Sequence, residues 1–259
     1  MTSPSPAGLD TMTLDDSGSV ATLTIGTGQR FNALGQQEWE ILKHAATSLA
    51  EHETLRAVVI RGRGGVFCSG SDLREWEDAS PDAVSASFAG MEAALQAIED
   101  LPVPTVAAVE GFATGAGCQL ALACDLQLMN QSAKIGMPIA RLGLLVPATF
   151  ANRMSLRIGP SRTKDLLYGG RLLTAHQAND IGLITTVVAD DDVDAALGEL
   201  LTRWDGLSAA SLRASKAAVD LGLSPVAHPA RHAPQGPASD PQEFASRVNS
   251  FLHRHSRRR

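Results

Sequence analysis

The sequence predicts an α/β fold, and three observations support that prediction. Short apolar runs typical of buried strands alternate with longer stretches in which apolar residues recur at helical spacing. Twice, at 66–76 and at 109–125, an apolar run ends in a glycine-containing turn that leads into a helix. The 259 residues are 44% hydrophobic and include 23 Gly but only 4% aromatic residues, a composition suited to a large core with many tight turns.

The N-terminal part of the chain predicts a strand followed by a helix. Residues 1–13 are rich in Pro and Ser, and we expect them to be disordered. The first strand is predicted at 20–25, where apolar and polar side chains alternate. The helix predicted at 36–53 then places four apolar side chains on one face: Trp39, Leu42, Ala46 and Leu49.

The middle of the chain repeats this order, and the last third is mainly helical. Buried strands are predicted at 55–62, 105–109 and 126–130, and a helix at 82–100. A loop with strand character at its start covers 134–147. The later helices are expected, with one strand at 184–189 between them, at 149–158, 160–168, 174–180, 191–205 and 208–222. A Pro-rich linker is predicted at 223–241, before a final helix at 242–255.

Charge and cysteine content exclude several classes of protein. The net charge of −6 argues against nucleic acid or an anionic membrane as a partner. The three cysteines form no CxxC pair, and no secretory signal or apolar run near 18 residues is evident, so we expect a reduced, cytoplasmic protein. No His/Cys cluster has metal-ligand spacing, and we expect no metal. Dinucleotide, P-loop and serine-hydrolase motifs are incomplete.

The two glycine turns suggest a shared chemical role. In the first glycine turn (67–72, "FCSGSD"), Gly70 permits a backbone geometry that leaves the amide of Ser69 or a neighbour free. In the second glycine turn (113–119, "ATGAGCQ"), unsatisfied amides lie at the positive end of a helix. Two such donors can stabilise one oxygen that becomes negative, as on a thioester carbonyl. The alternative is that both are simply tight turns between buried elements.

These motifs resemble those of a known family. The stretches "NAL" at 32–34, "VFCSGSDL" at 66–73, "PTVAAVEGFATGAGCQLALACDL" at 104–126 and "GLI" at 182–184 occur in the order and spacing of the enoyl-CoA hydratase/isomerase (crotonase) superfamily. The resemblance covers about residues 14–222. It implies a ββα spiral core at 14–195, a C-terminal helical trimerisation region at 196–259, homotrimers or dimers of trimers, and acyl-CoA or related acyl-thioester ligands with no separate cofactor.

The resemblance also implies a set of site residues. It assigns the oxyanion hole to the backbone amides of Ser69 and Ala116, with Ala116 in place of the more usual Gly. It places CoA along Arg30, Phe31, Asp72 and Leu73. It implies that the acyl pocket is lined by Cys68, Gly117, Met137, Ile139 and Pro147. Arg30 would meet a CoA phosphate, unless it simply faces solvent.

The acid/base residues of the family are missing. The hydratases use two Glu, in the motifs GGGCE and QPE, and the matching positions here are Gln119 and Ile139. An Asp used in other branches of the family would fall on Pro147. A positioned acid or base contributes about 10² to 10⁴ in rate, so ordinary hydration is not expected. Gln119 either orients a water or a substrate carbonyl, or is a helix residue satisfied by the backbone.

Two functions remain open. The first is a non-standard lyase or isomerase that polarises a thioester carbonyl through an oxyanion hole and in which other groups move the protons. The second is an acyl-thioester binding protein without turnover. Substitutes for the two carboxylates are weak candidates, because each has a plainer role as a helix cap, a solvent-exposed group or a surface ion pair: Asp72, Glu75, Arg141, His228 and His232.

Overall fold

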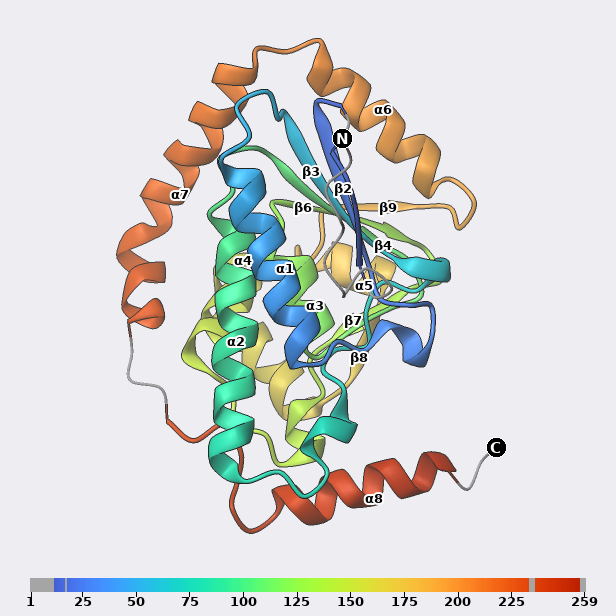
Figure 1. Cartoon of the computed structure of the whole chain (residues 1–259), viewed down its shortest axis with the longest axis vertical. Helices are drawn as coiled ribbons and strands as arrows, with labels where there is room; N and C mark the ends of the chain where they lie inside the picture. Colours follow the sequence, from blue (N-terminus) through green and yellow to red (C-terminus); the bar gives the residue numbers. More distant parts are fainter. Residues whose placement is uncertain (1–11, 17, 233–235, 257–259) are drawn as a thin grey trace, which may run out of the picture.

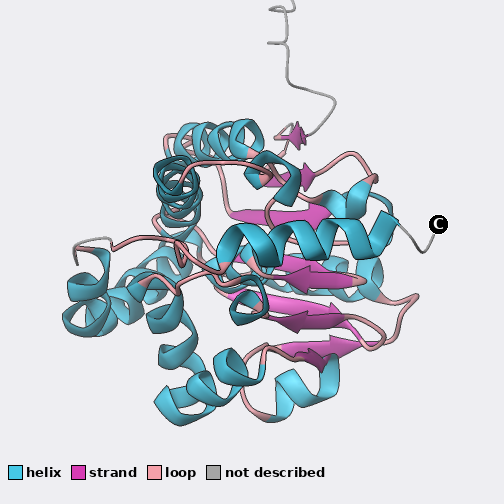
Figure 2. Cartoon of the chain, turned by 90° about the horizontal axis from the view of Figure 1, so that it is seen from below, coloured by secondary structure: helices cyan, strands magenta, loops and turns pink. Residues whose placement is uncertain are grey.

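A six-stranded sheet forms the centre of the molecule. Residues 12–16, 18–232 and 236–256 are described by a computed structural model of the chain. The strand order is β1-β2-β3-β4-β6-β9, with β1 antiparallel to β2 and the other neighbours parallel. Figure 2 shows these strands stacked side by side with helices around them. The strands are β1 (Met12–Asp15), β2 (Val20–Ile25), β3 (Ala57–Gly62), β4 (Thr105–Val109), β6 (Leu126–Asn130) and β9 (Thr186–Val188).

Helices cover both faces of this sheet, which confirms the predicted α/β class. Side chains alternate along β3, so that Val58 and Ile60 pack into the main core while Val59 packs against the opposite face. The main core lies beneath α1 (Gln36–Ala50), α2 (Pro81–Glu99) and α3 (Ala116–Ala123), and the opposite face is covered by α6 (Val193–Asp205). Strands buried on both faces read as continuous apolar runs, which explains the four consecutive apolar residues at 106–109 in β4.

A smaller sheet and a kinked helix extend the core. The strands β5 (Phe112–Thr114), β7 (Lys134–Gly136) and β8 (Leu172–Thr174) form a second sheet, followed by α5 (Ala175–Asp180). The helices predicted at 149–158 and 160–168 form one kinked element, α4 (Ala148–Gly169). The kink is at Gly159, whose φ of 77° precedes Pro160.

Short elements were the main omission of the sequence prediction. Neither β1, β5 nor β8 was predicted, because three or four residues are too few to show a period. Of the N-terminal segment expected to be disordered, residues 1–11 lie outside the described part, whereas Met12 begins β1. Four 3-10 helices complete the described elements: η1 (Arg30–Asn32), η2 (Arg63–Gly65), η3 (Leu73–Trp76) and η4 (Ile139–Leu142).

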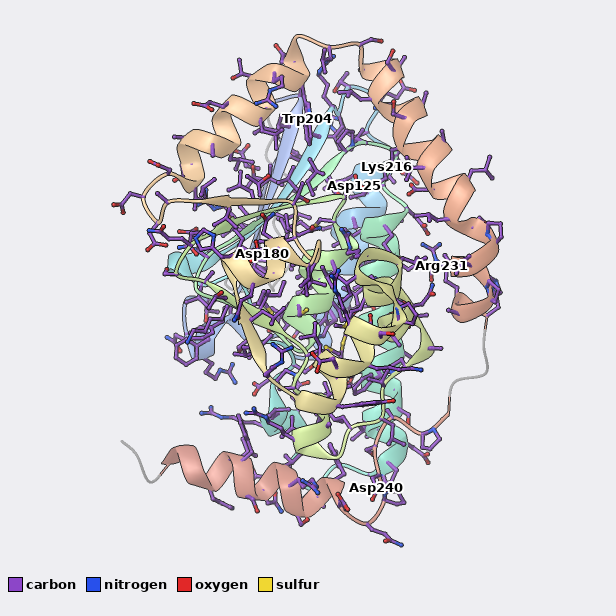
Figure 3. All side chains as sticks on the ribbon, turned by 180° about the vertical axis from the view of Figure 1, so that it is seen from behind. Asp125, Asp180, Trp204, Lys216, Arg231 and Asp240 are labelled. Carbon is purple, nitrogen blue, oxygen red and sulfur yellow. The ribbon has the colours of Figure 1, made fainter. Side chains whose placement is uncertain are left out.

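The predicted start of the Pro-rich linker at 223 is wrong. The helix α7 (Ala209–Arg231) continues through Pro225 and Pro229, although proline lacks the amide proton of a helix interior. Two ion pairs connect this helix to the core: Lys216 pairs with Asp125 at 2.9 Å (Figure 3), and Arg231 at its end pairs with Glu99 at 3.0 Å. These ion pairs lie before and after the two prolines and connect the helix to the core.

The predicted boundary between core and C-terminal region lies within a helix. Position 195/196 falls inside α6, and α6 packs on the sheet through Val193 and Leu197. The C-terminal helix α8 (Phe244–Ser256) lies below the rest of the molecule in Figure 1 and contacts η3 and η4. Among the helices in the described residues, none combines the length and apolar character needed to cross a bilayer.

Candidate active site

Backbone hydrogen bonds join the two glycine turns. In the first glycine turn, the Cys68 amide donates to the carbonyl of Phe112 at 2.8 Å, and the Cys68 carbonyl accepts from Thr114 at 3.0 Å. Gly117 makes this approach possible, because a Cβ there would lie 2.1 Å from the Cys68 carbonyl oxygen. The two turns are therefore held as one rigid unit at the N-terminus of α3.

One of the two predicted oxyanion amides is engaged elsewhere. The Ser69 amide donates to the Phe31 carbonyl at 2.9 Å, so the prediction that it is the free donor is wrong. The neighbour two residues on, Ser71, has no acceptor for its amide among the described residues. It follows Gly70, which has a φ of 102° and an ideal Cβ position only 3.2 Å from the Ala116 nitrogen. Gly70 therefore brings the Ser71 amide close to Ala116.

The Ala116 amide likewise has no hydrogen-bond acceptor among the described residues. Ala116 begins α3, so its N–H has no intrahelical partner, and no other acceptor for it occurs in the described residues. Its backbone φ is not positive, so alanine is tolerated where the resemblance implies glycine. The required left-handed geometry is placed one residue earlier, at Gly115 with a φ of 57°. The Ser71 and Ala116 amides, both without an acceptor in the described residues, therefore belong to the two segments that meet where Gly70 approaches Ala116.

Gln119 and Ile139 are both buried, and neither carries a carboxylate. Gln119 is one turn beyond Ala116 on α3 and has no exposed surface, and Ile139 at the start of η4 is 6% exposed. The Gln119 Nε2 contacts the Met137 Sδ at 3.8 Å. Pro147 precedes the first turn of α4 and adds no ionisable group. The Gln119 side chain is hydrogen-bonded to other side chains and not to the backbone, so the alternative that the backbone satisfies it is wrong.

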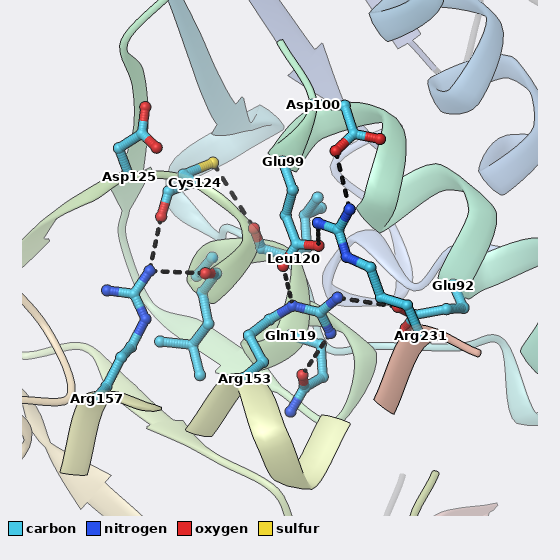
Figure 4. Close-up of polar contacts among 12 residues, drawn as sticks. Glu92, Glu99, Asp100, Gln119, Leu120, Cys124, Asp125, Arg153, Arg157 and Arg231 are labelled. Atoms are coloured by element: carbon cyan, nitrogen blue, oxygen red, sulfur yellow. Dashed lines mark hydrogen bonds and ion pairs between the residues drawn. The ribbon is translucent and has the colours of Figure 1, made fainter. Parts of the chain in front are cut away.

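A buried guanidinium organises the polar groups behind Gln119. Arg153 of α4, 7% exposed, donates from Nη1 to the Gln119 Oε1 at 3.0 Å, from Nη2 to Glu92 at 3.0 Å and from Nε to Glu99 at 2.6 Å (Figure 4). Arg231 of α7 makes a second ion pair with Glu99. Four helices thus meet in one cluster, which we call the Arg153 cluster: Glu92, Glu99, Gln119, Arg153 and Arg231.

The two carboxylates of the cluster differ in their acidity. Burial raises the pKa of Glu92, against the opposing effect of Arg153. Its Oε2 is buried with no hydrogen-bond partner in the described part of the chain. Burial also acts to raise the pKa of Glu99, but Arg153 and Arg231 outweigh it and hold that pKa below its usual value. Glu92 is therefore the carboxyl group of this cluster that takes up a proton more readily.

The residues predicted to hold CoA lie together on the surface near the first glycine turn. Arg30 pairs with Asp72, and Asp72 also accepts from the Arg74 amide as the cap of η3. Phe31 is 60% exposed and packs edge-to-face on Phe112 with ring centroids 5.9 Å apart. Leu73 packs at the edge of the core. The helix-cap alternative for Asp72 is confirmed.

Among the described side chains, the other candidate groups cap a helix, are exposed or are buried thiols. Glu75 accepts from the Gln36 amide at 2.8 Å and so caps α1. The side chain of His228 lies outside the described residues, and His232 is exposed one residue beyond α7. The three cysteine thiols are buried, and burial raises the pKa of each to about 12. No group of His, Cys, Asp and Glu side chains suited to a metal ion occurs among the described residues.

Comparison with known proteins decides the family. The family model described as enoyl-CoA hydratase/isomerase matches residues 15–253. The chain belongs to the enoyl-CoA hydratase/isomerase family. This confirms the resemblance drawn from the sequence motifs and extends it through the C-terminal helix.

Relatives and solved structures of this family match most of the chain. A probable enoyl-CoA hydratase of Mycobacterium tuberculosis is 32% identical over 212 residues, which cover 82% of this chain and 81% of that protein. The human mitochondrial methylglutaconyl-CoA hydratase is 30% identical over 214 residues, covering 81% and 63%. A crystal structure of an enoyl-CoA hydratase of Bacillus anthracis is 25% identical, with a TM-score of 0.78 and coverage of 93% and 91%. The chain thus has the crotonase fold.

Several residues of the candidate site in this enoyl-CoA hydratase/isomerase family member were not predicted from the sequence. Ser71 lies inside the motif that was identified, but only the hydrogen bond of the Ser69 amide distinguishes the two serines. Arg153, Glu92 and Glu99 lie on predicted helices, and charged residues at buried helix positions were the available signal.

Proposed function

We propose that this chain binds an acyl-CoA or related acyl thioester and polarises its carbonyl with the backbone amides of Ser71 and Ala116. It then acts as a non-standard lyase or isomerase, and not as an ordinary two-Glu hydratase. The observation that carries the proposal is the close approach of Gly70 to the Ala116 nitrogen, with both amides lacking an acceptor in the described residues. Family membership supports the thioester as the ligand.

The two amides suit a transition state in which the thioester oxygen becomes negative. Main-chain donors that are fixed before the reaction need no reorganisation when charge develops, and one such donor is worth about 10² to 10³ in rate. The donors belong to turns that are joined by backbone hydrogen bonds, so their spacing is fixed by the fold. A thioester whose carbonyl oxygen is held there would be activated for enolate formation.

The rest of the pocket argues against water addition by two carboxylates. Gln119 and Ile139 occupy the positions that the resemblance assigns to the catalytic Glu residues, and neither side chain exchanges a proton. Reactions that need less proton transfer, such as decarboxylation or double-bond migration, suit an oxyanion hole that lacks these groups. The same observation favours a second candidate function, in which the thioester is bound without turnover.

The test compares the unaltered chain with a variant that restores both carboxylates. Crotonyl-CoA hydration is followed by loss of absorbance at the enoyl band. We expect negligible hydration by the unaltered chain and faster hydration by the Gln119→Glu, Ile139→Glu double variant. Rapid hydration by the unaltered chain would contradict the proposal. If acyl, enoyl and malonyl thioesters all bind but survive unchanged, the binding function is supported instead.

Three further statements stay predictions. A homotrimer or a dimer of trimers is supported by the apolar side chains that α7 exposes, Val219, Leu221 and Val226. A cytoplasmic location is supported by the unpaired, buried cysteines. We expect no cofactor other than the CoA portion of the substrate. Size-exclusion chromatography with light scattering tests the assembly.

A further inference from the structure

We propose that Gln119 is a fixed hydrogen-bond donor that selects acyl groups carrying an oxygen on C3, and that Arg153 is the residue that positions it. The inference rests on the proposed function, because it concerns the acyl group held by the same oxyanion amides. The oxygen on C3 can belong to a ketone, as in a 3-oxoacyl group, or to a carboxylate, as in a malonyl group.

The orientation of the Gln119 amide is set by chemistry. The Arg153 Nη1 lies 3.0 Å from the Gln119 Oε1, and a guanidinium carries only donors. If the amide were turned over, its NH₂ group would face N–H groups, and both contacts would be lost. The Oε1 must therefore face Arg153, and the NH₂ group must face the other way.

Arg153 cannot easily turn away from this contact. Its Nε and Nη2 atoms donate to Glu99 at 2.6 Å and to Glu92 at 3.0 Å, so all three nitrogens of the guanidinium are engaged. Charge-assisted bonds of this kind are about twice as strong as neutral ones. The amide of Gln119 is thus held through Arg153 by the carboxylates of α2.

The donor side of Gln119 has no good partner. Its Nε2 carries two protons, and its one partner among the described residues is the thioether of Met137 at 3.8 Å. A thioether is a weak acceptor, and the Gln119 side chain has no exposed surface at which water would replace it. Met137 is an unbranched side chain with rotatable bonds, so a ligand oxygen can displace its sulfur.

The position of Gln119 selects C3 of the acyl group. Gln119 is three residues after Ala116 on α3, and side chains at that spacing on one helix face lie about 5–6 Å apart. A thioester whose oxygen is held at the Ala116 amide would therefore extend its acyl chain along the same helix face, with C3, two bonds beyond the thioester carbon, directed toward the Gln119 NH₂ group. An oxygen there would accept a hydrogen bond from the Gln119 N–H group that now has only the Met137 sulfur as its partner.

Binding of three CoA thioesters tests the inference. Dissociation constants of acetoacetyl-CoA, malonyl-CoA and butyryl-CoA are measured by isothermal titration calorimetry with the full chain. Acetoacetyl-CoA and butyryl-CoA have the same chain length and differ at C3, so their ratio isolates the oxygen. We expect acetoacetyl-CoA or malonyl-CoA to bind at least about 10-fold more tightly than butyryl-CoA, and the tighter of the two identifies the ketone or the carboxylate.

Two variants assign the selectivity to these residues. Gln119→Met keeps the size of the side chain and removes the donor, and we expect the ratio to fall to about 1 while butyryl-CoA affinity stays within about 2-fold. Arg153→Lys should lower the ratio in the same direction, because a lysine cannot hold both carboxylates and the amide. Gln37→Met, at an exposed position of α1, is the matched control and should keep the ratio.

The outcomes are distinct. Equal binding of the three thioesters by the unaltered chain, or a ratio that survives Gln119→Met, would overturn the inference and leave the proposed function intact. Failure of all three to bind would overturn both. If Arg153→Lys does not fold, the Gln119→Met ratio still decides the role of Gln119.

Discussion

Removal of Arg153 is the most informative single perturbation of this fold. In an Arg153→Met variant, Glu92 loses its only positively charged partner among the described residues, while Glu99 keeps Arg231. Methionine has a similar length and no charge, so the variant leaves two carboxylates in a buried site. Breaking a buried ion pair from one side costs about 3–5 kcal/mol. For a chain of this size, that is on the order of 10 °C in Tm.

The assay is urea unfolding followed by circular dichroism, at fixed protein concentration and at several pH values. We expect the midpoint to fall with an unchanged slope. The loss in free energy of unfolding should be largest near pH 7–8 and should decrease as the pH falls toward about 4. At low pH, Glu92 and Glu99 take up protons and no longer need a positively charged partner. The higher pKa of Glu92 makes it the first of the two to be relieved.

Arg231→Met is the matched control, because Arg231 also pairs with Glu99 but its side chain is 30% exposed. A partly exposed pair is screened by solvent and contributes about 1 kcal/mol or less. If Arg153→Met costs no more than this control, or if its cost does not decrease at low pH, the description of the Arg153 cluster as a buried network of charges is wrong.

Three other predictions use the same unfolding assay, thioester binding or a thiol titration. Glu92→Gln should leave the free energy of unfolding at pH 7–8 unchanged or higher, because the raised pKa of Glu92 means that its charged form is unfavourable in the folded chain. Glu99→Gln should lower the free energy of unfolding by about 1–3 kcal/mol, because the pKa of Glu99 is lowered. The reverse order would contradict these pKa directions. Gly117→Ala should abolish thioester binding and destabilise the fold, because its Cβ would lie 2.1 Å from the Cys68 carbonyl oxygen. The control Gly198→Ala in α6, where a Cβ meets nothing within 4 Å, should stabilise the fold by about 0.5–1 kcal/mol. Thioester binding by Gly117→Ala would refute the close approach of Gly117 to Cys68. The three thiols, with pKa values of about 12, should not react with a disulfide reagent at pH 8 until the chain is unfolded, and rapid reaction in the native state would show that they are not buried.

Elements with a clear local pattern were predictable, and contacts between distant elements were not. The alternation in β2 and the one-sided apolar stripe of α1 are written into consecutive residues, and the structure has both. By contrast, α7 continues through two prolines to Arg231, which pairs with Glu99 of α2 and with the adjacent Asp100, more than 130 residues earlier in the chain. Helix propensity contains no information about such a partner.

The sequence by itself determined the α/β class, the family, both glycine turns and the absence of a carboxylate at 119 and 139, because each of these is a property of residue identity and short-range spacing. Only the tertiary structure decided which serine amide is free and which way the Gln119 amide points. Those two features depend on single hydrogen bonds, from Ser69 to Phe31 and from Arg153 to Gln119, that join residues 38 and 34 positions apart. A hydrogen bond is specified to tenths of an ångström, and the spacing of motifs along a chain does not define positions that finely.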